Sequence, residues 1–530
     1  MQDKVARAAA PAPPPPAAEG VPELSQRRVL VVIGALMLGM LLAALDQTIV
    51  ATALPTIAGD LHGLAHLSWV VTGYLLAATV STPLWGKLGD MYGRKFFFEA
   101  AIVIFLVGSA LSGLSSSMFE LIAFRALQGL GAGGLMVGAQ AIIGDVVPPR
   151  ERGKYQGIFG AVFGLSSVAG PLLGGFFVQN LSWHWIFYIN LPIGAIALVV
   201  TTGALPKALR RVQHVIDYLG AVLLAGGAAC LVLLTTLGGT TYPWGSAPIL
   251  IMAVLGGLLL LGFVFVERRA VEPILPLSLF RNRIFSATSA IGFIVGFSMF
   301  GAITYLPTYL QVVRGASPTG SGLELLPLMG GLLVTSIGSG VLISRWGRYK
   351  IFPILGTAVM TVGLLLFSRL GLHTSTLTIA IYMVVLGLGL GGVMQVLVIA
   401  VQNAVPHQEL GVATSGATFF RSIGGSFGTA IFGAIFANVL TGKLAHYLRG
   451  VQLPAGFNGA AGASPAALAK LPPAVHAGYI QAVTASLHPV FLWAVPFALL
   501  AFATTWLLKE VPLRRTVRPS HVPAPQPAES

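Results

Sequence analysis

"GKLGDMYGRK", residues 86–95, returns later in the chain as "GVLISRWGRY", residues 340–349. Both copies keep Gly at the first and eighth positions, Leu at the third and Arg at the ninth. Two further pairs follow in the same order: "GLGAGGL" (129–135) with "GLGLGGV" (387–393), and "VVPPRERG" (146–153) with "AVPHQELG" (404–411). Because the three offsets nearly agree, the chain is predicted to consist of two related halves.

The composition places these halves in a membrane. Of 530 residues, 55% are hydrophobic and 9% are charged, which leaves too few polar side chains to cover a soluble globule of this size. Apolar segments of about 18 to 25 residues recur along the chain, long enough to cross a hydrocarbon core as helices. The segments are continuously apolar rather than alternating, and this predicts helices instead of a barrel.

The apolar segments predict an all-α polytopic membrane protein with fourteen transmembrane helices. The predicted spans are 28–51, 67–86, 96–114, 118–141, 156–178, 185–205, 217–237, 248–266, 285–311, 320–343, 351–370, 375–400, 412–438 and 489–508. The repeats divide them into two six-helix bundles, 28–205 and 285–508, joined by a linker, 206–284, that carries two extra central helices. The longest loop, about 439–488, is expected outside the cell, with a composition that permits short helices.

Basic residues predict the orientation. With the N-terminus inside, alternate loops hold clusters of Lys and Arg, whereas the opposite loops hold only Arg314, Arg369, Lys443, Arg449 and Lys470. This asymmetry places both termini in the cytoplasm of a plasma-membrane protein, and it explains the net charge of +14 without a nucleic-acid partner. Residues 1–27 are predicted to be a disordered cytoplasmic tail, and residues 509–530 a second cytoplasmic tail.

Four motifs stand in order on these spans: "LDQTIVATALP" in the first, "GKLGDMYGRK" after the second, "RALQGLGAGG" in the fourth and "GLSSVAGPLLGG" in the fifth. Together they resemble the motifs of the major facilitator superfamily, and specifically of its fourteen-span drug:proton antiporters of the EmrB/QacA type. The resemblance covers nearly the whole chain. It implies the major facilitator fold and multidrug efflux by antiport, which confers antibiotic resistance, in a bacterial membrane.

The loop after the second span carries the motif "GKLGDMYGRK", with Gly86, Asp90, Gly93 and Arg94. Its glycines permit a tight reversal, while the acid can cap a neighbouring helix and the arginine can pair with an acid. Such a charged clasp can hold one conformation and release in another. The resemblance places it against the start of the thirteenth span. The alternative is a loop whose basic residues only set topology.

The fifth span carries the motif that resembles the antiporter signature, at Gly164, Gly170, Pro171, Gly174 and Gly175. Small residues allow a neighbouring helix to approach, and the proline allows a bend. Ordinary helix packing would explain the same residues. The resemblance implies that the bend helps to seal the interior on the cytoplasmic side and accompanies exchange. The matching segment of the second half, "FFRSIGGSFGTA", has no Gly-Pro pair.

Asp46 and Arg125 are charges inside predicted spans. At 1.5 Å per residue, both lie roughly 7 to 11 Å below the outer boundary, so contact between them is possible. Burial disfavours a charged carboxylate and a neighbouring arginine favours it, so a group balanced in this way can bind and release a proton. We therefore predict that this pair couples transport to protons. A static buried ion pair, or a carboxylate that caps a helix near the interface, is the alternative.

Three further residues are weaker candidates for a substrate site or a second proton site: Glu324, Arg421 and Tyr305. Glu324 lies near the outer end of its span and could equally be a solvated rim residue. Arg421 is an intramembrane charge with no acid nearby in sequence. Tyr305 could line a pocket, although aromatic residues at span ends are often interfacial.

The function expected from these observations is proton-coupled export of amphipathic, often cationic compounds by alternating access. A dedicated exporter of one metabolite, antibiotic or lipid is the alternative within the same fold. An enzyme is disfavoured, because the sequence has neither metal-ligand spacing nor a Walker loop. We expect no metal and no cofactor other than the proton gradient, and a protein that works as a monomer with small substrates, protons and lipid as its partners.

Overall fold

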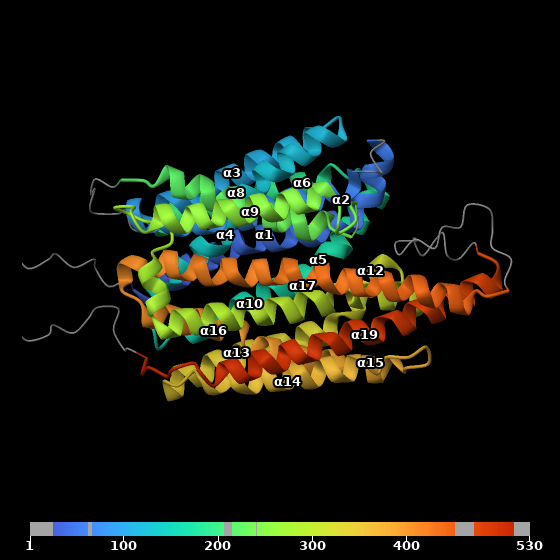
Figure 1. The fold of residues 1–530 in the computed structure, drawn as a ribbon. Coiled ribbons are helices and arrows are strands. Elements are labelled where there is room, and N and C mark those ends of the chain that lie inside the picture. Colours follow the sequence, from blue (N-terminus) through green and yellow to red (C-terminus); the bar gives the residue numbers. More distant parts are fainter. Residues whose placement is uncertain (1–24, 62–65, 206–214, 240, 451–470, 514–530) are drawn as a thin grey trace, which may run out of the picture.

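The computed structural model describes residues 25–61, 66–205, 215–239, 241–450 and 471–513. The predicted tails at 1–27 and 509–530 fall largely outside these residues, as does the middle of the predicted 439–488 loop. The described chain is helical throughout, apart from turns and one isolated bridge at Gly238 and Tyr242 (Figure 1).

The first half and the linker contain nine helices in the described residues. They are α1 (Gln26–Asp60), α2 (Leu67–Tyr92), α3 (Arg94–Leu114), α4 (Met118–Val146), α5 (Arg152–Asn180), α6 (Trp185–Tyr188), α7 (Asn190–Ala204), α8 (Tyr218–Leu237) and α9 (Ala247–Glu267). The helices of the second half are α10 (Arg283–Ile303), α11 (Leu306–Thr308), α12 (Pro318–Glu324), α13 (Leu326–Trp346), α14 (Ile351–Phe367), α15 (Thr376–Gly391), α16 (Met394–Ala404), α17 (Leu410–Tyr447) and α19 (Pro473–Thr505). Two short 3-10 helices, η2 (Leu277–Arg281) and η4 (His407–Glu409), and one π-helical turn, η3 (Tyr309–Val313), lie between them.

Every predicted span overlaps one of these helices or a pair of them. Within the described residues, eleven helical stretches are long and apolar enough to cross a membrane. The other three predicted spans correspond to α2 and to two shorter apolar helices, at Arg283–Met299 and Ile351–Phe367. The chain is therefore a multi-pass all-helical membrane protein.

The two halves have matching internal packing. In the first, α2 and α3 pack on α4 and α1 packs on α5; in the second, α13 and α14 pack on α15 and α10 packs on α17. The halves meet through two reciprocal pairs, α2 with α17 and α5 with α13. Each repeated loop also holds a glycine at positive φ, which favours glycine: Gly93 (φ 105°, ψ 130°) and Gly347 (φ 72°, ψ 12°). Their ψ angles differ, so the two loops do not share one conformation.

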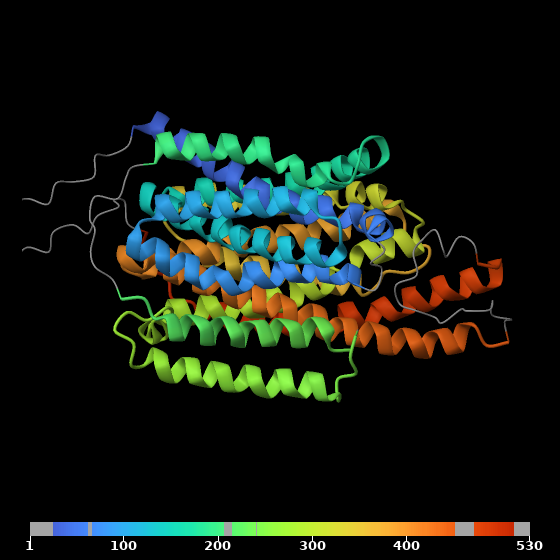
Figure 2. The same cartoon turned by 90° about the horizontal axis from the view of Figure 1, so that it is seen from above.

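Helices α8 and α9 pack on each other, and α8 contacts α2 and α17. The pair forms one edge of the molecule, drawn in green in Figure 2. Asp217 caps α8, as expected for an acid before a helix, because its side chain accepts a hydrogen bond from the Gly220 amide at 2.8 Å.

Helix α1 begins and α19 ends at the same end of the bundle, which we call the terminal end (Figures 1 and 2). At the opposite, distal end, α17 and α19 project beyond the other helices. Both flanks of the predicted 439–488 loop are helical, since α17 continues to Tyr447 and α19 begins at Pro473. The second flank, 473–488, holds four alanines, and alanine is a strong helix former.

Candidate functional site

A buried ion pair between α1 and α4 lies at the centre of the first half. The Arg125 guanidinium donates through Nη1 to the Asp46 carboxylate oxygen Oδ2. Their side chains are 1% and 0% exposed. The predicted depths agree with this geometry, because the structure brings the two residues into direct contact.

Two amide side chains complete the ring of donors around Asp46. Gln128 donates through Nε2 to Oδ1 at 2.9 Å, and it accepts from Arg125 Nη1 at 2.8 Å. From α7, Asn190 donates through Nδ2 to Oδ1 at 3.2 Å and also to the Ser109 hydroxyl at 3.0 Å. The carboxylate therefore receives three donors from two other helices, which is the arrangement that buried charge requires.

Aromatic rings cover the arginine. Its Cζ lies 4.2 Å from the centroid of the Tyr74 ring and 5.8 Å from that of Phe187. The Tyr74 hydroxyl in turn donates to the Ala43 carbonyl on α1 at 3.2 Å. These rings exclude water, and their faces attract the guanidinium cation. The site thus holds the Asp46 carboxylate and the Arg125 guanidinium together away from solvent.

Glycines in α4 let α2 and α3 approach this site. A Cβ on Gly129 would lie 2.3 Å from the Tyr74 carbonyl oxygen, and one on Gly131 would lie 2.5 Å from the Phe105 amide nitrogen. Neither position has room for a side chain. The run "GLGAGG" therefore packs helices, so its glycines are needed for close backbone approach.

A second charged cluster joins the halves at the terminal end. Asp90, on α2, accepts from the Gly411 amide at 3.0 Å and from the Val412 amide at 2.7 Å, at the start of α17. Arg94 pairs with Asp90 at 2.6 Å and also with Asp145 of α4. The carboxylate caps the positive end of α17, as the resemblance implied for the clasp.

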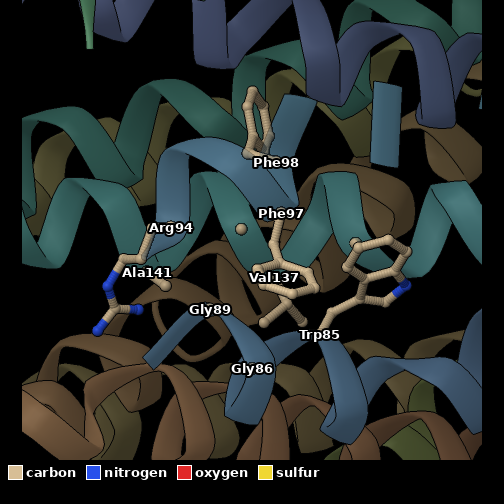
Figure 3. Close-up of a pocket in the computed structure, with 10 residues that line it drawn as sticks. Trp85, Gly86, Gly89, Arg94, Phe97, Phe98, Val137 and Ala141 are labelled. Carbon is tan, nitrogen blue, oxygen red and sulfur yellow. The ribbon is translucent and has the colours of Figure 1, made fainter. Parts of the chain in front are cut away.

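Burial dominates the protonation of the clasp acid. Removal from water raises the pKa of Asp90 to about 6, against the opposing influence of Arg94 and the α17 amides. Gly86 lets α2 come this close, because a Cβ there would lie 2.6 Å from the Gly411 carbonyl oxygen. A small pocket beside the clasp is lined by Gly86, Arg94 and the Phe97 and Trp85 rings, with the arginine at one side and the rings across from it (Figure 3).

A parallel set of contacts closes α5 against α13. Arg150 donates to the Ser344 carbonyl at 3.0 Å and to the Arg345 carbonyl at 2.8 Å. A Cβ on Gly153 would lie 2.4 Å from the Gly340 carbonyl oxygen. Both halves of the molecule are therefore in close contact at the terminal end.

The antiporter motif faces two different helices. A Cβ on Gly170 would lie 2.1 Å from Thr48 Oγ1, and one on Gly174 would lie 2.1 Å from Thr52 Oγ1, so these glycines press α5 onto α1. Gly164 instead faces Leu333 of α13. Pro171 and Gly175 lie within the same helix, which the structure keeps continuous from Arg152 to Asn180 rather than interrupted at the proline.

The three weaker candidates lie apart from this site. Glu324 is exposed at the end of α12, as a rim residue would be. Tyr305 packs on α17, with its ring centroid 5.1 Å from that of Phe436. Arg421 lies half-buried on α17 beside Gly292 and Gly296 of α10.

Sequence reasoning missed Gln128, Asn190 and Tyr74. Gln128 follows Arg125 by three residues and so lies on the same face of α4, a signal that was available. Asn190 and Tyr74 carry no comparable signal, because their proximity depends on how α7 and α2 pack. Within the described residues no group of three or more His, Cys, Asp or Glu side chains is arranged to hold a metal ion.

Comparison with known proteins agrees with the architecture and the motifs. A family profile of the Major Facilitator Superfamily matches residues 36–429. The chain belongs to the major facilitator superfamily. It is therefore a membrane transporter and not an enzyme.

Several relatives carry transporter names. An uncharacterized MFS-type transporter of Mycobacterium tuberculosis (strain H37Rv), Rv1877, is 48% identical over 495 residues, which are 93% of this chain and 71% of the relative. Multidrug transporter protein MdtP of Bacillus subtilis (strain 168) is 42% identical over 426 residues, with 80% and 78% covered. Multidrug resistance protein 3 of the same organism is 36% identical, with 92% and 96% covered.

Solved structures share the fold at low identity. The proton:xylose symporter XylE superposes with a TM-score of 0.61 at 14% identity, over 93% of this chain and 98% of XylE. The human organic anion transporter MFSD10 gives the same TM-score at 15% identity, over 92% and 100%. At these identities the likeness concerns the fold alone.

Proposed function

We propose that this transporter is a proton-coupled exporter with fourteen membrane spans and both termini in the cytoplasm. The observation that carries the proposal is the Asp46 carboxylate, fully buried in the first half and held by Arg125, Gln128 and Asn190. A carboxylate whose charge is balanced by a few fixed donors can exchange a proton when water reaches it. The multidrug names of two relatives support drugs as the transported compounds, and the resemblance of the motifs to drug:proton antiporters supports efflux as the direction.

In the proposed orientation the terminal end is the cytoplasmic end. The clasp at Asp90 and the contact of Arg150 with α13 then correspond to a state closed toward the cytoplasm. From this state Asp46 takes a proton from the medium while substrate leaves outward. Protonation loosens Arg125, the halves rock, the clasp opens, and the proton leaves inward as the next substrate enters.

The substrates of this exporter are amphipathic, often cationic small molecules, taken from the cytoplasm or the inner leaflet. The proton gradient alone drives the cycle, without a metal or cofactor, and one copy of the chain in the plasma membrane suffices. A dedicated exporter of one metabolite, antibiotic or lipid would use the same residues.

Ethidium efflux from reconstituted vesicles with a pH readout tests the proposal. Wild-type protein should extrude ethidium uphill when a pH gradient is imposed, and Asp46→Asn should lose coupled efflux while still folding. Asp60→Asn is the matched control, since Asp60 lies on the same helix but is exposed. Uphill, gradient-dependent efflux by the Asp46→Asn variant would show that Asp46 is not the coupling site.

A further inference from the structure

Arg421 lies deep in the membrane on a helix enclosed by protein. It comes eleven residues after Leu410, the start of α17, or about 16 Å at 1.5 Å per residue, near the middle of a hydrocarbon core about 30 Å thick. No residue of α17 between Leu410 and Ala430 is exposed, and α17 packs against α2, α4, α8, α10 and α19. The side chain therefore lies among helices and is too deep to reach the headgroups.

The guanidinium of Arg421 has no partner in the described part of the chain: neither an ion pair nor a hydrogen bond engages it. Arg125, the buried arginine of the first half, is fully engaged by Asp46 and Gln128. An arginine at the centre of a helix costs about 2.5 to 3.5 kcal/mol on insertion scales, so it normally serves a partner. Asp46 is already occupied and cannot be that partner in this conformation.

The packing of α10 on α17 brings two more polar atoms to the same level, one from each helix. A Cβ on Gly424 would lie 2.1 Å from the Phe293 carbonyl oxygen, and one on Gly428 would lie 2.0 Å from that of Phe297, so α10 and α17 run parallel in a fixed register. This register sets Ser289 level with the turn that holds Thr418 and Arg421. The hydroxyl oxygens of Ser289 and Thr418 are both buried without a hydrogen-bond partner.

Helix α16 adds an amide. Gln402, near its end, donates to Thr414 of α17 at 3.1 Å, and the short connection between the two helices makes them antiparallel. Two turns back along α16 and two turns forward along α17 lead to Gln395 and Arg421, on the same faces as the contacting pair. The Gln395 side-chain oxygen is also buried without a partner.

We infer that Arg421, with Ser289, Thr418 and Gln395 at its level, binds an anionic group of the transported compound. This inference rests on the proposed function and adds amphipathic organic acids and zwitterions to the cationic compounds proposed there. In the first half, Asp46 and Arg125 neutralise each other. In the second half, the positive charge of Arg421 has no acid to balance it, so it is suited to an anionic group. The midplane depth is where secondary transporters hold their substrates.

Matched probes test the inference on the purified full-length chain. 1-Naphthaleneacetate and 1-naphthaleneacetamide share a ring system and differ in charge, and each competes with tritiated 1-naphthaleneacetate in a proximity binding assay. Wild-type protein should bind the acid about tenfold more tightly than the amide, as one charge-assisted hydrogen bond provides. Equal affinity for the two probes, or no specific binding of the acid, overturns the inference without any variant.

Substitutions at Arg421 test whether this residue causes the preference for the acid over the amide. Arg421→Gln should abolish the preference for the acid, and Arg421→Lys should retain part of it. Arg369→Gln is the control. It makes the same chemical change as Arg421→Gln, but at an exposed residue in the turn after α14. An unchanged preference in Arg421→Gln overturns the inference. Ethidium efflux by the wild type separates the two proposals: efflux without acid preference contradicts only this one, and absence of efflux contradicts the proposed function.

Discussion

At the scale of single residues, Gln128 determines how the buried carboxylate is held. It donates to Asp46 and accepts from Arg125, so it links both members of the ion pair. Gln128→Leu should lower the free energy of unfolding by about 1 to 3 kcal/mol, because a buried donor to a charge is lost. The measurement is unfolding in mixed micelles, with the exposed Gln408→Leu as control.

A double-mutant cycle measures the interaction energy between Gln128 and Asp46. It compares Gln128→Leu, Asp46→Asn and the variant that carries both changes. A coupling of about 0.5 to 3 kcal/mol is expected for residues in one buried network. If the two changes were additive within about 0.5 kcal/mol, the hydrogen bond between Gln128 and Asp46 would make no contribution of its own.

The charged residues of the site could be predicted from the sequence, whereas its neutral residues could not. Asp46 and Arg125 are conspicuous because a charge in an apolar span needs a partner, and span lengths give both the same depth. Asn190 and Tyr74 resemble ordinary residues at span ends. Their place beside the pair follows from helix packing, which periodicity does not specify.

At the scale of helices, the glycines of α5 set its distance from α1. Gly170→Ala would put a Cβ 2.1 Å from Thr48 Oγ1 and 3.0 Å from the Ile49 amide nitrogen, so the helices must separate. We expect a loss of about 1 to 3 kcal/mol in the free energy of unfolding, typical of overpacking, together with reduced efflux.

Gly203 of α7 supplies the matched control for this change. A Cβ there meets nothing within 4 Å, so Gly203→Ala should be neutral or stabilising by up to about 1 kcal/mol, since alanine favours helix more than glycine. Equal stability of the two alanine variants would mean that α5 does not need its glycine against α1.

At the scale of the molecule, the duplication could be predicted because loops and glycines repeat at nearly constant offset. The resemblance implied the pair α2 with α17 through the clasp, but the pair α5 with α13 could not be predicted. It joins helices that are 146 residues apart at the nearest (Asn180 to Leu326) through small residues that carry no directional signal. Helices α17 and α19 extend beyond the predicted spans for another reason. A helix that leaves the membrane loses its apolar pattern while keeping its backbone hydrogen bonds.

Also at the scale of the molecule, the balance between its closed and open conformations should depend on pH. Burial in the closed terminal end raises the pKa of Asp90 from 3.8 to about 6, so the closed conformation binds this proton more tightly than one in which Asp90 is in water. By linkage, protonation of Asp90 stabilises the closed conformation. This stabilisation is complete at pH values below 3.8, the ordinary pKa, and is lost as the pH rises through about 6. Acidification from pH 7 to pH 5 should therefore increase the closed population.

Spin labels at Phe96 and Gln408, both exposed at the terminal end on opposite halves, report this population as a distance distribution. The short-distance fraction should grow on acidification in the wild type and stay constant in Asp90→Asn, which cannot titrate. His407 also faces the cluster, at 3.2 Å from Asp145, so His407→Gln serves to remove its contribution. Were the pH response to persist in Asp90→Asn and vanish in His407→Gln, the histidine and not the clasp acid would set the balance between the two halves.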